Sequence, residues 1–233
     1  MKTSYLDESP YACIRAFILN TWFAEYSKLV DDTEAQNKKS FGVELEKKLA
    51  ERGHKLGGQY PDLQSGIFTL ELNFDAGKTK LWYGPKQELL DQFTLSVEDI
   101  VRGIEKARHG LGSGLGREEF LAKITQAFYR VIDKKMGDTA PIINVLSEVA
   151  LLLQSQKFQS DPRREHYKTY SRADFSFDLY QIRHSDSQFK TEITPQLVVA
   201  TRTHTSNRQN FIWIPDDETG RGTTYSHIKI KGG

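Results

Sequence analysis

The chain has 233 residues, of which 38% are hydrophobic and 27% are charged, and its formal net charge is +1. This length allows one large domain or two small ones, and 13 Phe and 10 Tyr supply much of the volume of a core. A net charge near zero excludes the global field that drives nonspecific nucleic-acid binding, so such binding would need a local patch.

Cysteine content and apolar runs indicate the compartment. Cys13 is the single cysteine, so an internal disulfide is excluded and an oxidising compartment has no support. The chain does not open with a charged segment followed by an apolar run, as a leader would. The longest apolar run, Val149 to Leu153, is far shorter than the roughly 20 residues that cross a bilayer. We therefore expect a cytoplasmic protein without a membrane partner.

A pair of helices is predicted at the start of the chain. Ser9 followed by Pro10 indicates a helix start, because a hydroxyl N-cap precedes a residue whose missing N–H is harmless at the first position. This helix is expected to run to about Asp31. A second helix should follow, with Leu45 on its apolar face and Gly53 as its end.

The first predicted helix is unusually apolar. Its large side chains spread over more of the circumference than a single stripe, so the helix is either a central core helix or a surface shared with another chain. We favour the shared surface, because the chain is small. The residues assigned to this partner interface are Phe17, Trp22 and Tyr26.

A β-hairpin is predicted next. The segment from Ile67 to Phe74 alternates between apolar and polar residues, and a turn-forming sequence separates it from a second run, Thr79 to Gly84. If the turn is centred on Ala76 and Gly77, Asn73 lies opposite Lys80.

The carboxylates around this hairpin suggest one catalytic hypothesis. Glu46, Asp62 and Glu71 follow in an order that resembles the PD-(D/E)xK nucleases, in which carboxylates hold magnesium beside the scissile phosphate. The resemblance implies metal ligands at Asp62 and Glu71, with Glu46 or the neighbouring Glu44 assisting. Asn73 stands where that family has lysine, so Lys80 would have to supply the ammonium. The alternative is a solvated hairpin face without catalytic residues, metal or cofactor.

A helical module is expected in the middle of the chain. Ser96 caps a helix that reaches Ala107, a second helix spans Arg117–Met136, and a third begins near Pro141. The spacing of these helices is similar to that of a winged-helix module. The glycine run from Gly110 to Gly116 lacks the pattern and context of a phosphate loop and is interpreted as a flexible connector.

Strands are predicted in the last third of the chain, which we expect to form an antiparallel sheet. The segments are Phe175–Leu179, Leu197–Thr203, Phe211–Pro215 and Thr224–Lys231. The predicted class is therefore α+β. Its expected parts are residues 1–95, 96–160 and 161–233, either as separate domains or as one continuous domain.

The last third is also rich in arginine. Guanidinium groups make forked contacts with phosphate or carboxylate, so this composition favours contact with DNA or with an acidic partner. The residues assigned to this contact are Arg163, Arg164, Arg202 and Arg208. The histidines stand at no metal-ligand interval, so zinc is not expected.

The order of these segments resembles one known group of proteins. The segments concerned are the stretch from Tyr60-Pro61-Asp62-Leu63 through Leu72, the middle helices, Phe175 to Tyr180, and Leu197 to Thr201 running on to Ile212–Pro215. Their order is similar to that in a small non-ATPase subunit of a prokaryotic SMC/Rad50-like anti-phage defence system of the Lamassu type. The resemblance implies an accessory protein that sits on an ATPase head and helps to gate a nuclease.

The sequence therefore predicts one of two functions. The first is a non-catalytic interaction subunit of a DNA-associated protein complex, with an SMC/Rad50-like ATPase and a nuclease as partners. The second is a magnesium-dependent nuclease that uses Glu46, Asp62, Glu71 and a displaced Lys80.

Overall fold

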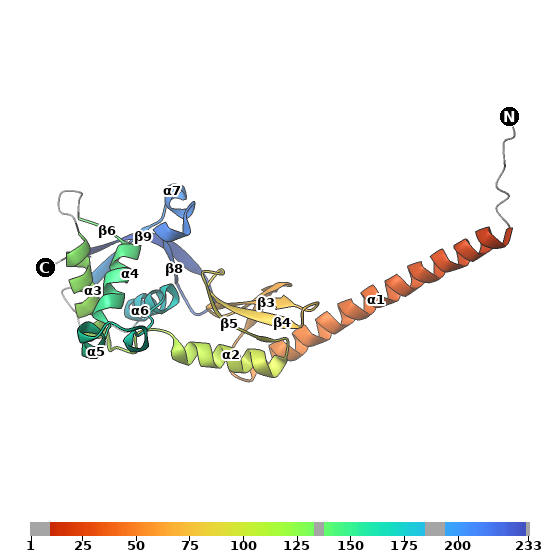
Figure 1. Ribbon diagram of the computed structural model, residues 1–233, viewed down its shortest axis with the longest axis horizontal. Helices are drawn as coiled ribbons and strands as arrows, with labels where there is room; N and C mark the ends of the chain where they lie inside the picture. Colours follow the sequence, from red (N-terminus) through yellow and green to blue (C-terminus); the bar gives the residue numbers. More distant parts are fainter. Residues whose placement is uncertain (1–9, 133–137, 185–193, 232–233) are drawn as a thin grey trace, which may run out of the picture. The chain divides into compact units, whose positions relative to one another are not determined.

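The computed structural model describes residues 10–132, 138–184 and 194–231. The chain divides into two compact units, Met1–Lys48 (unit 1) and Leu49–Gly233 (unit 2). Both helices and antiparallel sheets are present (Figure 1), so the predicted α+β class is confirmed.

Unit 1 consists of most of a single long helix, α1 (Pro10–Ala50). The predicted helix pair is therefore wrong. The residues between Asp31 and Ser40 include neither Pro nor Gly, and Ala, Glu, Gln and Lys among them favour the helix. An ion pair one turn apart supports the same stretch, with Lys38 Nζ 3.3 Å from Glu34 Oε2.

Unit 2 begins with a five-stranded antiparallel sheet whose strands are ordered as in the sequence. They are β1 (Leu56–Gln59), β2 (Asp62–Ser65), β3 (Phe68–Asn73), β4 (Lys78–Tyr83) and β5 (Glu88–Thr94). Helix α2 (Val97–Gly110) contacts β4 and β5, and its N-cap is Ser96, as predicted. The Ser96 hydroxyl accepts a hydrogen bond from the Asp99 N–H at 3.4 Å.

The predicted hairpin is present as β3 and β4, but its predicted register is wrong. Lys80 lies opposite Glu71, and Asn73 lies opposite Lys78. The connection is longer than a two-residue turn, because the Asn73 carboxamide oxygen accepts a hydrogen bond from the Ala76 N–H at 2.8 Å. Gly77 completes the turn with a φ of 59°.

The rest of unit 2 packs helices against a four-stranded sheet in which β9 is the common partner of the other strands. The helices are α3 (Arg117–Val131), α4 (Ile142–Leu152), α5 (Gln156–Ser160), α6 (Arg172–His184) and α7 (Arg202–Thr205), with short 3-10 turns η1 (Arg164–His166) and η2 (Arg208–Asn210). The strands are β6 (Ala140–Pro141), β7 (Thr194–Val199), β8 (Ile212–Pro215) and β9 (Gly222–Lys231). The antiparallel sheet predicted for this region is confirmed, and the helix predicted to reach Met136 ends at Val131, with residues 133–137 outside the described part.

The strand predicted at Phe175–Leu179 is wrong, because this segment lies within helix α6. A capping box explains the helix. The Ser171 hydroxyl accepts from the Asp174 N–H at 3.2 Å, and the Asp174 carboxylate accepts from the Ser171 N–H at 2.9 Å. Of the side chains that alternate in the sequence, Phe175 and Leu179 are buried, and with Ile182 they follow helical spacing.

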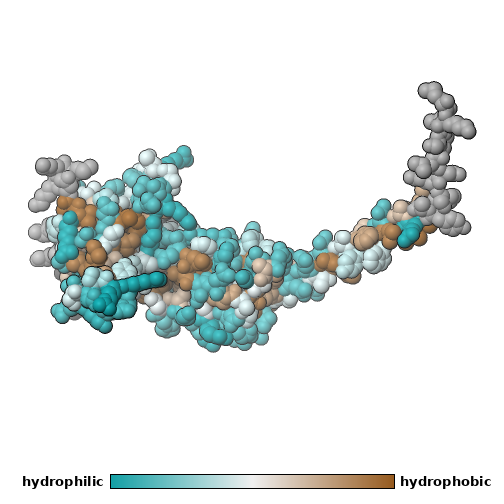
Figure 2. Space-filling model, viewed as in Figure 1, coloured by the Kyte–Doolittle hydropathy of each residue, from teal (hydrophilic) through white to brown (hydrophobic). Residues whose placement is uncertain are grey.

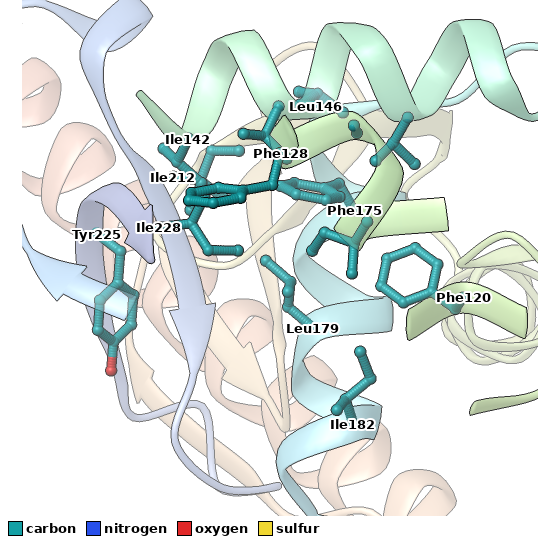
Figure 3. Packing of buried hydrophobic residues seen from close by; sticks show 14 of the residues in the cluster. Phe120, Phe128, Ile142, Leu146, Phe175, Leu179, Ile182, Ile212, Tyr225 and Ile228 are labelled. Carbon is teal, nitrogen blue, oxygen red and sulfur yellow. The ribbon is translucent and has the colours of Figure 1, made fainter. Parts of the chain in front are cut away.

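The main core of unit 2 lies between these helices and the C-terminal sheet. Figure 3 shows its labelled side chains converging from α3, α4, α6, β8 and β9. They are Phe120, Phe128, Ile142, Leu146, Phe175, Leu179, Ile182, Ile212, Tyr225 and Ile228. Burial of this many aliphatic and aromatic groups fixes α6 against β8, and that contact positions a small cavity beside the start of α6.

Candidate functional site

The N-terminal half of α1 exposes a set of large apolar side chains. Phe17, Trp22 and Tyr26, which the sequence assigns to a partner interface, are 72%, 56% and 54% exposed. Figure 2 shows brown apolar surface along this part of the helix. The other exposed members are Ile14, Ile18, Leu19, Phe23, Leu29 and Val30.

Most of these residues share one side of the helix. At about 100° per residue, Ile14, Ile18, Leu19, Trp22, Phe23, Tyr26, Leu29 and Val30 occupy roughly half of the circumference. We call these eight residues the apolar face of α1. Phe17 lies outside it, among polar residues such as Asn20 and Ser27.

Aromatic contacts order the centre of the apolar face. The rings of Trp22 and Tyr26 stack with their centroids 5.6 Å apart, and Phe23 meets Trp22 edge-on at 5.4 Å. Such contacts hold the side chains in defined positions before any partner binds, which lowers the entropy that association would otherwise cost.

The length of α1 raises the question of a membrane span. In the parts of the chain that the structure describes, no helix combines the length and the apolar character that crossing a bilayer requires.

A second cluster of functional groups lies on the five-stranded sheet in unit 2. Asp62 and Glu71 are directly opposite one another on β2 and β3. The Lys86 ammonium lies between them, 2.8 Å from Asp62 Oδ1 and 3.0 Å from Glu71 Oε2. Lys80 donates to Glu71 Oε1 at 3.1 Å, and the Trp82 indole N–H donates to Glu71 Oε2 at 3.0 Å. The structure thus brings together three residues of the predicted nuclease set, Asp62, Glu71 and Lys80.

The charges in this cluster stabilise one another. The hydrogen bond from Lys86 lowers the pKa of Glu71, and the hydrogen bond to Asp62 raises the pKa of Lys86. Two carboxylates and water can hold magnesium, but here the ammonium of Lys86 lies between the carboxylates, where a shared cation would bind. Within the described residues, no group of three His, Cys, Asp or Glu side chains is arranged for a metal. Glu46 is exposed on α1, in unit 1.

The arginines assigned to an acidic or nucleic-acid partner are spread over several elements of unit 2. Arg163 and Arg164 follow α5, whereas Arg202 lies in α7 and Arg208 in η2. In Figure 1, α5 lies at the lower edge and α7 at the upper edge of the part of unit 2 that contains α3, α4 and α6. Arg163 is ion-paired with Asp161, with Nε 2.9 Å from Oδ2. A single surface would therefore have to extend over much of unit 2 to include all four.

Comparison with known proteins decides nothing about this chain. No protein-family model, curated protein or solved structure matches it.

The glycine run after α2 is structural. The Gly112 N–H donates to Asp174 Oδ1 and the Ser113 N–H donates to Asp178 Oδ2, both at 2.9 Å. Burial raises the pKa of Asp178, whose Oδ2 also accepts from the Tyr170 hydroxyl at 2.7 Å. Carboxylates of α6 already accept hydrogen bonds from these two backbone N–H groups. The glycine run therefore holds α6 in place, and a phosphate-binding role for it gains no support.

Sequence reasoning missed Lys86, Arg172 and Gln87. Lys86 lies in the turn after β4 with a φ of 57°, and no motif indicates that its ammonium reaches β2 and β3. Arg172 lies in the arginine-rich last third of the chain, where nothing in the sequence separates it from the other arginines, and Gln87 gives no signal. The positions of these side chains depend on contacts between segments far apart in the chain.

Proposed function

We propose that this chain is a non-catalytic interaction subunit whose helix α1 packs against helices of a different protein. One observation carries the proposal, namely the exposure of the whole apolar face of α1, from Ile14 to Val30. Soluble proteins rarely leave so many neighbouring large apolar groups in water unless a binding surface requires them.

The composition of the apolar face suits a protein interface. Trp and Tyr are enriched among residues that dominate binding energy, and Trp22 and Tyr26 lie side by side at its centre. Full burial of one large apolar side chain contributes about 1.5–3 kcal/mol before the costs of association are subtracted. Burial of a few such residues is enough for a specific complex.

The spacing within the face favours a helical partner. Ile14, Ile18, Trp22, Tyr26 and Val30 follow one another at intervals of four, which makes a continuous apolar ridge. Ridges of this kind pack into the grooves of a second helix, most often at a crossing angle of about −50°. Helices of an SMC/Rad50-like ATPase are the first candidate, because the order of segments resembles an accessory subunit of such systems.

Association with DNA is the second element of the proposal. Its support is the arginine content around α5 and α7, with Arg163, Arg164, Arg202 and Arg208 as the expected phosphate contacts. Affinity for duplex DNA should fall with salt, and each lost phosphate contact should reduce the log–log slope by about 0.9. An unchanged slope after replacement of all four by Ala would remove DNA contact from the proposal.

Co-purification with the candidate ATPase tests the main proposal. The tagged chain is coexpressed with it and purified as wild type, as Trp22→Ser/Tyr26→Ser, and as the control Asn20→Ala/Ser27→Ala on the other side of α1. We expect the wild type and the control to retain the ATPase and the first variant to lose it. Equal retention by all three would exclude the apolar face as the contact surface.

A magnesium-dependent nuclease is the second candidate function. The observation that favours it is the convergence of Asp62, Glu71 and Lys80 on the open face of the sheet. Lys86 opposes it, because a metal would have to displace its ammonium from both carboxylates. Magnesium-dependent cleavage of DNA that Glu71→Gln abolishes would establish this function in place of the first.

A further inference from the structure

A small cavity with both polar and apolar walls lies in unit 2 where the turn after β4 meets the start of α6 and the strands β8 and β9. Its volume is about 130 Å³. The polar residues that line it are Gln87, Arg172, Arg208 and Thr224, and Trp213 forms part of its apolar wall. A cavity this small takes one ionic group, since sites for drug-sized molecules measure about 300–1,000 Å³.

Two buried donors at this cavity have no acceptor among the described residues, namely Arg172 Nε and Gln87 Nε2. The orientation of the Gln87 amide is fixed, because its Oε1 accepts a hydrogen bond from the Trp213 N–H at 2.5 Å. Arg172 is anchored through Nη2, which donates to the Phe211 carbonyl. Buried polar groups in folded proteins nearly always have partners, and an unpaired charged donor is especially costly.

Two guanidinium groups and the Glu88 carboxylate lie close to one another at this place. Arg208 donates through Nη2 to the Lys86 carbonyl at 2.5 Å, which holds its guanidinium beside the cavity. Burial lowers the pKa of Arg172, and the nearby charge of Arg208 lowers it further, against the opposing effect of Glu88. Glu88 Oε2 accepts from the Ala173 N–H at 2.9 Å, at the start of α6. Within the described residues, neither arginine forms an ion pair with a carboxylate.

We propose that this cavity binds a single tetrahedral oxyanion of the phosphate class, either free or as the terminal phosphate of a small molecule. The guanidinium groups of Arg172 and Arg208 line the cavity from α6 and η2, and the several acceptor oxygens of one anion can pair with both. The Thr224 side chain completes the lining. Occupancy joins the turn after β4 to α6 and η2, so the anion stabilises the contact between the two sheets of unit 2. This inference does not depend on the partner of α1.

Thermal unfolding and calorimetry of the full chain test the inference with sodium phosphate, against sodium chloride at equal ionic strength. Phosphate should raise the Tm in proportion to the logarithm of its concentration once the site saturates, because it binds the folded state alone. Arg172→Gln should weaken phosphate binding roughly tenfold or more, since hydrogen bonds to charged groups are lost. The control is Arg130→Gln on α3, whose guanidinium pairs with Glu148 away from the cavity, and it should bind phosphate as the wild type does.

A second variant, Gln87→Glu, tests the inference if Arg172→Gln does not fold. Gln87→Glu keeps the acceptor for the Trp213 N–H and adds a carboxylate oxygen beside the arginines. It should raise the Tm without phosphate and abolish the phosphate-dependent rise. Adenosine 5′-monophosphate distinguishes a free anion from the terminal phosphate of a small molecule. Its binding at the same residues indicates a terminal phosphate, whereas binding of inorganic phosphate alone indicates a free anion. A Tm that responds equally to phosphate and chloride, or a phosphate response that Gln87→Glu leaves intact, would overturn the proposal.

Discussion

The indole of Trp22 stacks on the ring of Tyr26 on α1, with the centroids 5.6 Å apart and the planes 15° from parallel, while both side chains are more than half exposed. A stack of this kind in the core would be expensive to remove, whereas an exposed stack contributes little to folding. An exposed stack therefore indicates an interface, and a buried stack would indicate a core helix.

Trp22→Ala and Phe17→Asp, made separately, should leave the free energy of unfolding within about 0.5 kcal/mol of the wild type, because both side chains are exposed. A buried aromatic truncated to Ala would instead cost roughly 3–5 kcal/mol. Urea denaturation of each purified variant gives the values. If both variants unfold the protein, α1 is a core helix and the interface interpretation is lost.

Three glycines allow the cost of packing against Trp213 to be separated from the cost of backbone strain. A Cβ added at Gly222 would lie 2.4 Å from the Trp213 ring without a positive φ, and one at Gly77 would meet nothing within 4 Å but would have a φ of 59°. Gly84 combines both features, with a φ of 57° and a contact of 2.4 Å.

Gly222→Ala should therefore destabilise unit 2 by about 1–3 kcal/mol through overpacking. Gly77→Ala should cost about 1 kcal/mol through strain alone, and Gly84→Ala should cost most. Chemical denaturation gives all three values. An Ala at Gly84 that costs no more than the one at Gly77 would show that Trp213 is free to move.

Lys86→Met tests the charge cluster on the five-stranded sheet. Removal of the ammonium leaves the carboxylates of Asp62 and Glu71 facing one another, so stability at neutral pH should fall by roughly 0.5–1 kcal/mol. Hydrogen bonding from Lys86 lowers the pKa of Glu71 in the folded wild type. The contribution of this interaction to stability is therefore present above the pKa that Glu71 has in the unfolded state, and it disappears as the pH falls. The two proteins should therefore converge in stability on acidification.

The same variant should gain magnesium affinity, because the divalent ion replaces the missing positive charge. Isothermal titration calorimetry compares it with the wild type and with Lys80→Met, which retains the Lys86 bridge. Stronger magnesium binding by the wild type than by Lys86→Met would contradict this account and favour the nuclease function.

The pair His204 and His227 predicts a loss of stability in mild acid. Their ring centroids are 5.4 Å apart, and burial, followed by the charge of His204, lowers the pKa of His227 from 6.5. The folded state then binds fewer protons than the unfolded state. The contribution of neutral His227 to the stability of the fold is therefore intact above pH 6.5 and is lost as the pH falls below that value.

His227→Gln should flatten the fall in stability below pH 6.5, and His204→Gln should flatten it less, because burial of His227 remains. Urea midpoints measured at several pH values from 7.5 to about 5 give the slopes. Parallel curves for the wild type and His227→Gln would show that His227 does not titrate differently on folding.

Local chemistry explains which parts of the fold were predictable. Ser96 and the alternation in β3 and β4 gave a correct helix start and hairpin, because each depends on neighbouring residues. The capping box between Ser171 and Asp174 is also local and was overlooked, so alternation at Phe175–Leu179 was taken for a strand. The longer turn that sets the hairpin register contains a hydrogen bond from the Ala76 N–H to the Asn73 side-chain oxygen, which the residue pattern does not show.

The candidate sites divide in the same way. The width of the apolar surface on α1 was predictable from the sequence, but its exposure was not, because the same residues also fit a central core helix. Lys86 could not be placed from the sequence, because the turn after β4 brings its ammonium to two other strands. Gln87 and Arg172 are 85 residues apart in number and meet at one cavity only after α6 docks on β8.

Site-specific photo-crosslinking in intact cells tests the interaction-subunit account most directly. A photoreactive benzoylphenylalanine replaces Trp22 in one strain and Ser27, on the other side of α1, in the control strain. The account predicts one discrete adduct of this chain with a different protein from position 22 and none from position 27, with the partner identified by mass spectrometry. No adduct at position 22, or an adduct with a second copy of this chain alone, would contradict it.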